Sequence, residues 1–269
     1  MRNIKELTHA NWWDMREVRD LPSGGAYSYM ETGNPDKDAM ILIHGFGNSS
    51  RVWKMCMEFL ADEYHLVAVD LRGVGQSKVS DMFAYPIANQ ARDVLELMDA
   101  LGIDSAYIVG HSIGSIIAQA IAMQAPERVK KGVLVASFAR MHSKPAEIKA
   151  MYEQFNSTGD SNKRYSEADT YPDKEGFIYQ MDDRAKQPKQ FFTSTWWGMT
   201  MTDHRCFLQF IQSPMLMIWG SEDVISEAQR SELREGLPGC DVKIYEGIGH
   251  EVPSREPAKL AYDIREFCR

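Results

Sequence analysis

The sequence predicts an α/β fold in which a doubly wound, mostly parallel sheet carries an inserted helical cap. Short apolar runs recur along the 269 residues, and each run ends in turn residues. Helical patterns lie between these runs, and one long stretch has no strand pattern. A chain of this size buries roughly 70–75% of its unfolded surface, so it needs no disulfide or metal to fold.

Six apolar runs predict the strands. Each run is continuous and does not alternate with polar residues, which is typical of parallel strands covered by helices on both faces. The connections between such strands are right-handed by default. The predicted strands are residues 40–43, 66–69, 106–109, 133–135, 215–219 and 242–245.

Helical patterns separate several of these runs. Residues 89–101 place apolar side chains at helical spacing, and Gly102 follows as a helix C-cap. Residues 113–125 are nearly all apolar, as expected of a helix buried against a sheet, and Pro126 ends that pattern. A last helix is predicted at residues 257–267, with apolar side chains on one face.

The stretch between the fourth and fifth runs predicts a helical insertion. It mixes polar residues with many aromatic side chains. Roughly 70 residues without a sheet strand are too long for a simple loop. We therefore assign residues 1–137 and 212–269 to the core, and residues 138–211 to a helical cap or lid over one edge of the sheet.

The charge and the apolar pattern exclude several classes of partner. Lysine plus arginine number 30 and aspartate plus glutamate number 38, so the formal charge is −8. Nucleic acids and anionic membranes attract basic surfaces, so we expect neither as a partner. No uninterrupted apolar window of about 18 residues predicts a transmembrane helix. The N-terminal residues also lack the apolar core of a secretory signal.

The cysteines indicate the cellular compartment in which we expect the protein. The four cysteines are Cys56, Cys206, Cys240 and Cys268. They are scattered along the sequence and form no metal-binding cluster. Reduced thiols are the simplest interpretation, so we expect a cytoplasmic protein without a metal or another cofactor. The sequence leaves the oligomeric state open between monomer and homodimer. It also leaves Trp12 and Trp13 unexplained.

The segment Gly110-His-Ser-Ile-Gly114 is the first candidate for chemistry. It matches G-x-S-x-G between an apolar strand and an apolar helix, which is the context of a nucleophile elbow. A tight turn there strains Ser112 and raises its hydroxyl above the sheet, while the glycines leave room for nearby backbone. The start of the following helix offers N–H groups to an oxyanion. The alternative is a plain strand–helix turn.

A serine nucleophile needs a base, and the base needs an orienting acid. After a nucleophile elbow these follow in the order Asp or Glu, then His. Asp223 follows the fifth strand and His250 follows the sixth, so we predict these two residues. Glu222 is a rival acid, and the alternative for each is a solvated loop side chain. The other histidines, none of which lies beyond the last strand, are His9, His44, His65, His111, His142 and His204.

An oxyanion hole needs two backbone donors. The N–H of Ile113, directly after the nucleophile, is the first. The segment His44-Gly-Phe-Gly47 follows the first apolar run, and a glycine-rich turn there can aim the N–H of Phe46 at the site. The alternative is an ordinary turn. We expect His44 to be a hydrogen-bonded structural residue and not a second base.

Together these motifs resemble those of the α/β-hydrolase superfamily, in its serine-nucleophile, esterase-like branch with a helical cap. The resemblance runs from about Tyr27 to Arg269 and rests on five segments in the family order. They are His44-Gly-Phe-Gly47, Asp70-Leu-Arg-Gly-Val-Gly-Gln-Ser77, Gly110-His-Ser-Ile-Gly114, Gly220-Ser-Glu-Asp223 and Gly249-His250.

The resemblance implies a serine hydrolase with the α/β-hydrolase fold, in which Asp70 and Arg72 are structural. Ser115 stands where many relatives carry a second glycine, and we expect little effect from its small hydroxyl. Serine at position 112 argues against the haloalkane dehalogenase and epoxide hydrolase branches, which use aspartate. The loop at Gly45 has no HGGG-type pattern, so a specialist for bulky tertiary-alcohol esters is less favoured.

Three functional hypotheses follow. The first is hydrolysis of a carboxylic ester, thioester or lactone of a small to medium, largely apolar substrate through an acyl-enzyme, with Ser112, Asp223 and His250 as catalytic residues. The second keeps these residues but cleaves carbon–carbon bonds in ring-fission diketones, or acts as a lyase or perhydrolase. The third is a non-catalytic ligand receptor. All three take a small-molecule partner.

The substrate pocket is the least specific part of the prediction. Methionine and aromatic side chains fill adaptable apolar pockets, but they also form the core of a cap. The candidates for the pocket are His111, Phe138, Phe191, Trp196, Trp197, Met199 and Val224.

Overall fold

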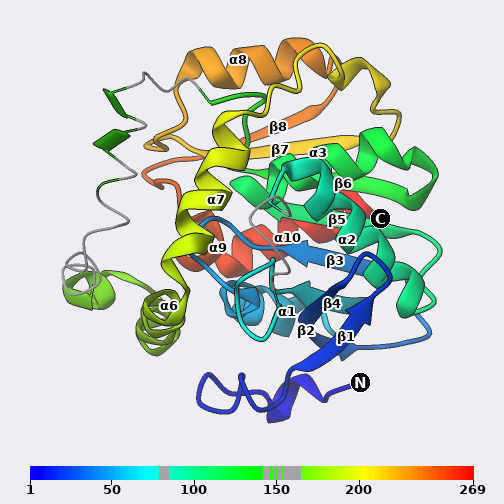
Figure 1. The fold of residues 1–269 in the computed structure, drawn as a ribbon, viewed down its shortest axis with the longest axis vertical. Helices are drawn as coiled ribbons and strands as arrows, with labels where there is room; N and C mark the ends of the chain where they lie inside the picture. The colour runs from blue at the N-terminus through cyan, green and yellow to red at the C-terminus, as the bar shows by residue number, and fades with distance from the viewer. Residues whose placement is uncertain (79–84, 142–145, 148, 151–152, 154–164) are drawn as a thin grey trace.

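The computed structural model describes residues 1–78, 85–141, 146–147, 149–150, 153 and 165–269 (Figure 1). Its centre is an eight-stranded sheet of order β1-β2-β4-β3-β5-β6-β7-β8. The strands are β1 (Glu17–Leu21), β2 (Gly25–Gly33), β3 (Ala39–Ile43), β4 (His65–Val69), β5 (Ala106–His111), β6 (Val129–Val135), β7 (Met215–Gly220) and β8 (Asp241–Tyr245).

The sheet is mostly parallel, which confirms the predicted fold class. The strands from β3 to β8 pair in parallel and correspond to the six apolar runs. The antiparallel pairs β1–β2 and β2–β4 were not predicted. They lie at one edge, where β1 is largely exposed and therefore lacks a continuous apolar run.

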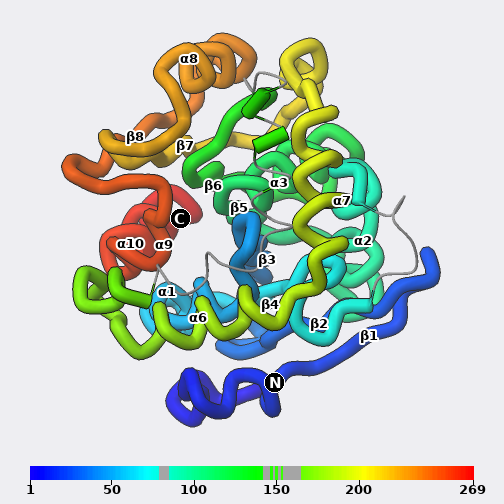
Figure 2. Tube along the Cα trace, turned by 60° about the vertical axis from the view of Figure 1, so that its left-hand side comes forward, coloured from blue at the N-terminus to red at the C-terminus, as the bar shows by residue number. Residues whose placement is uncertain are grey.

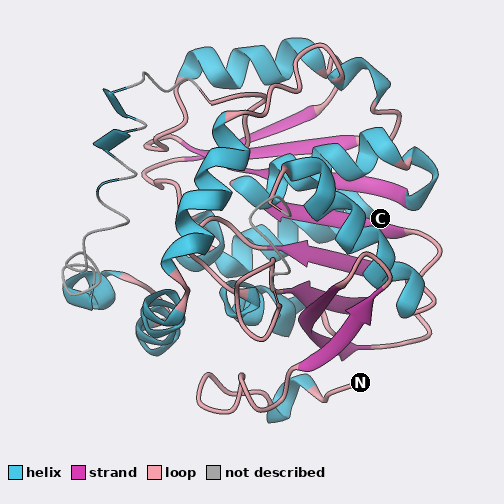
Figure 3. Cartoon of the chain, viewed as in Figure 1, coloured by secondary structure: helices cyan, strands magenta, loops and turns pink. Residues whose placement is uncertain are grey.

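Helices cover both faces of the sheet, as Figure 3 shows. On one face lie α2 (Ile87–Ala100), α3 (Ile113–Gln124) and α8 (Glu227–Gly236), and on the other α1 (Lys54–Leu60) and α10 (Pro257–Cys268), which follows the short α9 (Val252–Arg255). The predicted helices correspond to α2, α3 and α10. The sequence patterns missed α1, which is short, and α8, whose exposed face is rich in charge.

The helical insertion that the sequence predicts falls between β6 and β7. Its described residues form α6 (Lys174–Lys186), α7 (Lys189–Thr200) and two short 3-10 helices, Tyr165–Thr170 and Leu208–Phe210, and no strand of the sheet. Figure 2 shows α6 and α7 beside the ends of the central strands. Part of the predicted cap, at 142–145, 148, 151–152 and 154–164, lies outside the described residues.

The two faces of the sheet have separate apolar cores. One core joins the sheet to α2, α3 and α8, and the second joins it to α1, α10 and the N-terminal Trp12. In the described part of the chain, every helix is too short or too polar to span a bilayer.

Candidate active site

The turn from β5 to α3 holds Ser112 in a backbone conformation that residues with a side chain rarely adopt. Its φ is +54° and its ψ is −120°, and its N–H donates to the Val135 carbonyl at 2.9 Å. A Cβ on Gly110 would lie 2.2 Å from the Gly114 carbonyl oxygen, and one on Gly114 would lie 2.3 Å from that of Ile43. Both glycines are therefore required by close backbone contacts, as an elbow demands.

The structure brings Ser112, His250 and Asp223 together. His250 Nε2 lies 2.9 Å from Ser112 Oγ, and His250 Nδ1 lies 2.8 Å from Asp223 Oδ1. The Asp223 side chain is fully buried, while 23% of the His250 side chain is exposed. A carboxylate at Nδ1 requires a proton there, so Nε2 carries the lone pair that accepts the serine proton. The loops after β7 and β8 supply these two side chains.

A tight turn after β3 lies against the nucleophile. The Asn48 N–H donates to the Gly45 carbonyl at 3.1 Å, and Gly47 has a φ of +75°, as the third residue of a type II turn requires. A Cβ on Gly45 would lie 3.3 Å from Ser112 Cβ. The turn therefore places Phe46 next to the elbow, while Ile113 begins α3 directly after Ser112.

His44 is a structural residue. It is fully buried, and its Nε2 accepts the Leu71 N–H at 3.0 Å. Its Nδ1 must therefore carry the proton that reaches the Gly45 carbonyl at 2.7 Å. Burial lowers the pKa of His44 to about 4, so it is neutral at pH 7.

Asp70 and Arg72 are also buried, and their partners below are not triad residues. Asp70 accepts the Ser28 hydroxyl at 2.6 Å and the Ser50 N–H at 2.7 Å. Arg72 forms a buried ion pair with Asp93 on α2. These contacts tie the turn after β4 to its neighbours, which is a structural role.

Comparison with known proteins shows the family to which this chain belongs. The profile described as "alpha/beta hydrolase fold" matches residues 38–257, which is most of the chain. The chain belongs to the α/β-hydrolase family.

Named relatives cover almost the whole of this α/β-hydrolase. It is 28% identical to the "Uncharacterized hydrolase YugF" of Bacillus subtilis, over 94% of this chain and 98% of the relative. It is 24% identical to the "Monoacylglycerol lipase abhd6-A" of Xenopus laevis, over 90% of this chain and 78% of the relative. Among solved structures, an esterase from Thermogutta terrifontis superposes with a TM-score of 0.80 at 22% identity, over 94% of this chain and 97% of the other.

His111 of this hydrolase has a different place from the predicted one. It is 1% exposed, so it offers no face to a substrate pocket. Its Nε2 lies 2.8 Å from the His250 carbonyl oxygen and must donate a proton to it. Burial lowers the pKa of His111, so the ring stays neutral behind the base loop.

The other pocket candidates separate by burial. Phe191 and Trp196 lie with their ring centroids 6.1 and 6.0 Å from that of Phe46, in an aromatic cluster that also contains Phe192. Phe191 is fully buried, whereas Trp196 is partly exposed. Phe138 and Met199 are buried in the core beside α3. Trp197 and Val224 are 65% and 79% exposed. Adjacent helical residues point about 100° apart, which is why Trp196 and Trp197 differ.

The sequence patterns missed the residues that hold the turn at Phe46. Asp183 on α6 contacts Ser49, Gln187 at the C-cap of α6 contacts Asn48, and Arg51 joins Asp183. The only sign of these contacts in the sequence is that Ser49 and Arg51 stand just after a glycine-rich turn. Their partners are more than a hundred residues away in the chain, and no spacing rule connects them.

Proposed function

We propose that this hydrolase cleaves a carboxylic ester, thioester or lactone of a small to medium, largely apolar substrate through an acyl-enzyme. The observation that carries the proposal is the 2.9 Å contact between Ser112 Oγ and His250 Nε2. The buried Asp223 carboxylate behind His250 supports the same role, because it holds the imidazole in the tautomer that accepts a proton.

In the proposed mechanism, Ser112 Oγ attacks the acyl carbonyl while its proton passes to His250 Nε2. The carbonyl oxygen becomes an oxyanion, which the N–H groups of Phe46 and Ile113 stabilise. His250 then gives its proton to the leaving oxygen or sulfur, and the acyl-enzyme forms. Water attacks this ester as His250 takes its proton. The bond between the acyl carbon and Ser112 Oγ then breaks, His250 returns the proton to Oγ, and the carboxylic acid is released.

The aromatic cluster at Phe46 supports an apolar acyl or alcohol group. Phe46, Phe191, Phe192 and Trp196 gather beside the turn, with ring centroids 5.3 to 6.1 Å apart. A lipase and an esterase among the relatives are consistent with ester chemistry. We propose a small-molecule substrate and no nucleic-acid partner, and a cytoplasmic location that the four unpaired cysteines support.

A series of p-nitrophenyl esters from acetate to octanoate, with a γ-lactone and an acyl thioester, tests the proposal on the wild type and on Ser112→Ala. We expect turnover by the wild type and a loss of at least about a hundredfold in the variant. The preferred chain length then measures the pocket. Equal turnover by both proteins would remove Ser112 from the mechanism. Binding without turnover by either protein would favour a receptor.

A further inference from the structure

The residues after the turn at Phe46 are held from outside their own segment. The Asn48 carbonyl accepts Gln187 Nε2 at 3.0 Å, and the Ser49 hydroxyl donates to Asp183 Oδ2 at 2.8 Å. Both partners belong to α6 or its C-cap. The next two residues, Ser50 and Arg51, bond to Asp70 and Asp183. The insertion therefore reaches the turn directly.

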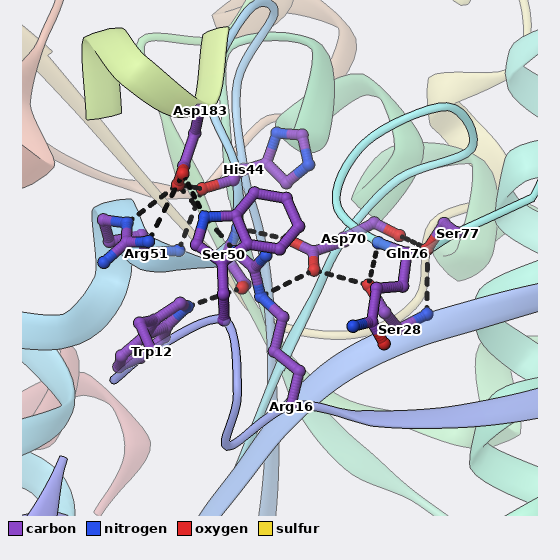
Figure 4. A network of polar contacts seen from close by, with 12 residues as sticks. Trp12, Arg16, Ser28, His44, Ser50, Arg51, Asp70, Gln76, Ser77 and Asp183 are labelled. Atoms are coloured by element: carbon purple, nitrogen blue, oxygen red, sulfur yellow. Dashed lines mark hydrogen bonds and ion pairs between the residues drawn. The ribbon is translucent and has the colours of Figure 1, made fainter. Parts of the chain in front are cut away.

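Four buried charges form the centre of this network. Asp183 Oδ2 accepts Arg51 Nε at 2.7 Å, and Asp70 Oδ2 lies 3.0 Å from Arg16 Nε. Arg16 Nη2 is 3.9 Å from Asp183 and links the two pairs. None of these side chains is more than 1% exposed. Figure 4 shows Asp183 facing Arg51, with Arg16 between Asp183 and Asp70.

The N-terminal segment closes the network. Trp12 is fully buried and its Nε1 donates to Ser50 Oγ at 3.1 Å. Trp13 Nε1 donates to Asp183 Oδ1, and the Arg16 guanidinium lies 3.8 Å from the centre of the Trp13 ring. Of the two tryptophans that the sequence left unexplained, Trp12 therefore belongs to the core and Trp13 contacts α6.

We propose that Asp183 is a positioning residue for the oxyanion hole. It acts through Ser49 and Arg51 on the turn that carries the Phe46 N–H, so the insertion helps to set the geometry of catalysis. This inference rests on the proposed function for its effect on rate. Its structural part, that Asp183 restrains residues 45–51, stands independently of the reaction.

The burial of these four charges makes the restraint on residues 45–51 sensitive to the loss of any one of them. Two arginines and two aspartates balance each other away from water, and removing one charge leaves its partner uncompensated. A donor that moves by about 1 Å stabilises the oxyanion much less, at a cost of up to about a hundredfold in rate. The helix α6 therefore cannot shift without disturbing the turn.

Asp183→Asn and Ser49→Ala test the proposal, with Asp173→Asn as the matched control. Asp173 caps the start of α6 and pairs with the His9 ring at 2.7 Å, so it joins the same helix to the same N-terminal segment. Arg51 binds His9 through the backbone carbonyl, which Asp173→Asn leaves in place. Ser49→Ala keeps all four charges, so it remains informative if Asp183→Asn folds poorly.

The rate is measured with p-nitrophenyl butyrate, and oxyanion binding with butylboronic acid, whose tetrahedral adduct on a serine mimics the intermediate. For Asp183→Asn we expect kcat to fall about 10- to 100-fold with KM changed less than about threefold, and boronate affinity to fall in parallel. Ser49→Ala should lose about fivefold. Asp173→Asn should stay within about twofold of the wild type.

Amide hydrogen exchange of residues 45–51 gives the readout that needs no activity. We expect faster exchange there in Asp183→Asn and Ser49→Ala than in Asp173→Asn. Rates, boronate affinity and exchange equal to those of Asp173→Asn would overturn the proposal and leave the esterase function intact. A wild type that neither turns over esters nor binds the boronate would overturn the proposed function, while exchange still decides the role of Asp183.

Discussion

At the scale of single residues, the site depends on side chains whose protonation is set by their contacts. Asp223 Oδ1 receives both His250 Nδ1 and the Ile225 N–H, at 2.8 and 2.9 Å. His111 supports the same loop from behind by donating to the His250 carbonyl. The base is therefore held at its ring by Asp223, on the loop after β7, and at its backbone by His111, at the end of β5.

Replacing His111 tests this second support. His111→Leu removes the donor to the His250 carbonyl, and we expect kcat on p-nitrophenyl butyrate to fall about tenfold with little change in KM. His111→Gln places an amide N–H near the same position and should restore most of the rate. A glutamine variant as slow as the leucine variant would show that the ring is needed for packing and not as a donor.

Two buried histidines predict how stability responds to acid. Burial lowers the pKa of His44 and of His204 to about 4. An unfolded histidine titrates near about 6.5, so between these values the unfolded chain binds protons that the folded chain does not. Stability is therefore complete above pH of about 6.5 and is lost as pH falls towards 4, by about 3 kcal/mol for each histidine.

Urea unfolding at several pH values between 7.5 and 4.5 measures this loss. His204→Gln removes one titrating group and keeps an amide near Gln119, whose Oε1 lies 3.0 Å from His204 Nδ1. We expect the free energy of unfolding of this variant to depend less on pH than that of the wild type. An unchanged dependence would mean that His204 does not resist protonation in the folded state.

At the scale of elements, the elbow works because α3 approaches the sheet very closely. The Cα of Gly114 faces the carbonyl oxygens of Ile43 and His44, and a Cβ there would lie 2.3 and 2.7 Å from them. The same approach brings the start of α3 beside the turn that carries Phe46. Close backbone packing and the proposed oxyanion hole are thus one arrangement.

Gly114→Ala tests this packing. Because backbone atoms cannot move aside as side chains do, we expect a loss of about 1–3 kcal/mol in the free energy of unfolding and a marked fall in kcat. The control is Gly239→Ala, where φ is +83° but no atom lies within 4 Å of the new Cβ. It should cost about 1 kcal/mol through backbone strain and leave kcat unchanged. A kcat of Gly114→Ala equal to that of Gly239→Ala would show that the close packing of α3 on the sheet does not affect catalysis.

At the scale of the whole molecule, the N-terminal segment joins the core to the insertion. Trp12 lies in the apolar core that contains α1 and α10, while Trp13 contacts Asp183 on α6. Three parts of the chain that are distant in sequence therefore share one buried network.

Trp12→Ala should destabilise the whole molecule. Removing a fully buried indole leaves a cavity and an unpaired Ser50 hydroxyl, so we expect a loss of about 3–5 kcal/mol in urea unfolding. Trp12→Phe refills part of the cavity and should lose less. A loss below about 1 kcal/mol in the alanine variant would show that this segment is not part of the cooperative core.

The sequence by itself determined the fold class and the order of the site segments. Continuous apolar runs identify buried parallel strands, and glycines mark the turns where backbone must approach closely, so β3 to β8 and the turns at Ser112, Asp223 and His250 were all found. Exposed edge strands and charged helices such as β1 and α8 carry no such pattern, because one face of each is solvated.

Only the tertiary structure decided which side chains meet. Sequence spacing placed His111 and Trp197 among the pocket candidates, but packing buries the first behind the base loop and leaves the second in solvent. It also joins Trp13, Arg51 and Asp183, whose partners are set by the path of the whole chain. Local patterns report which face of an element is apolar, whereas contacts across a fold depend on how the elements pack together.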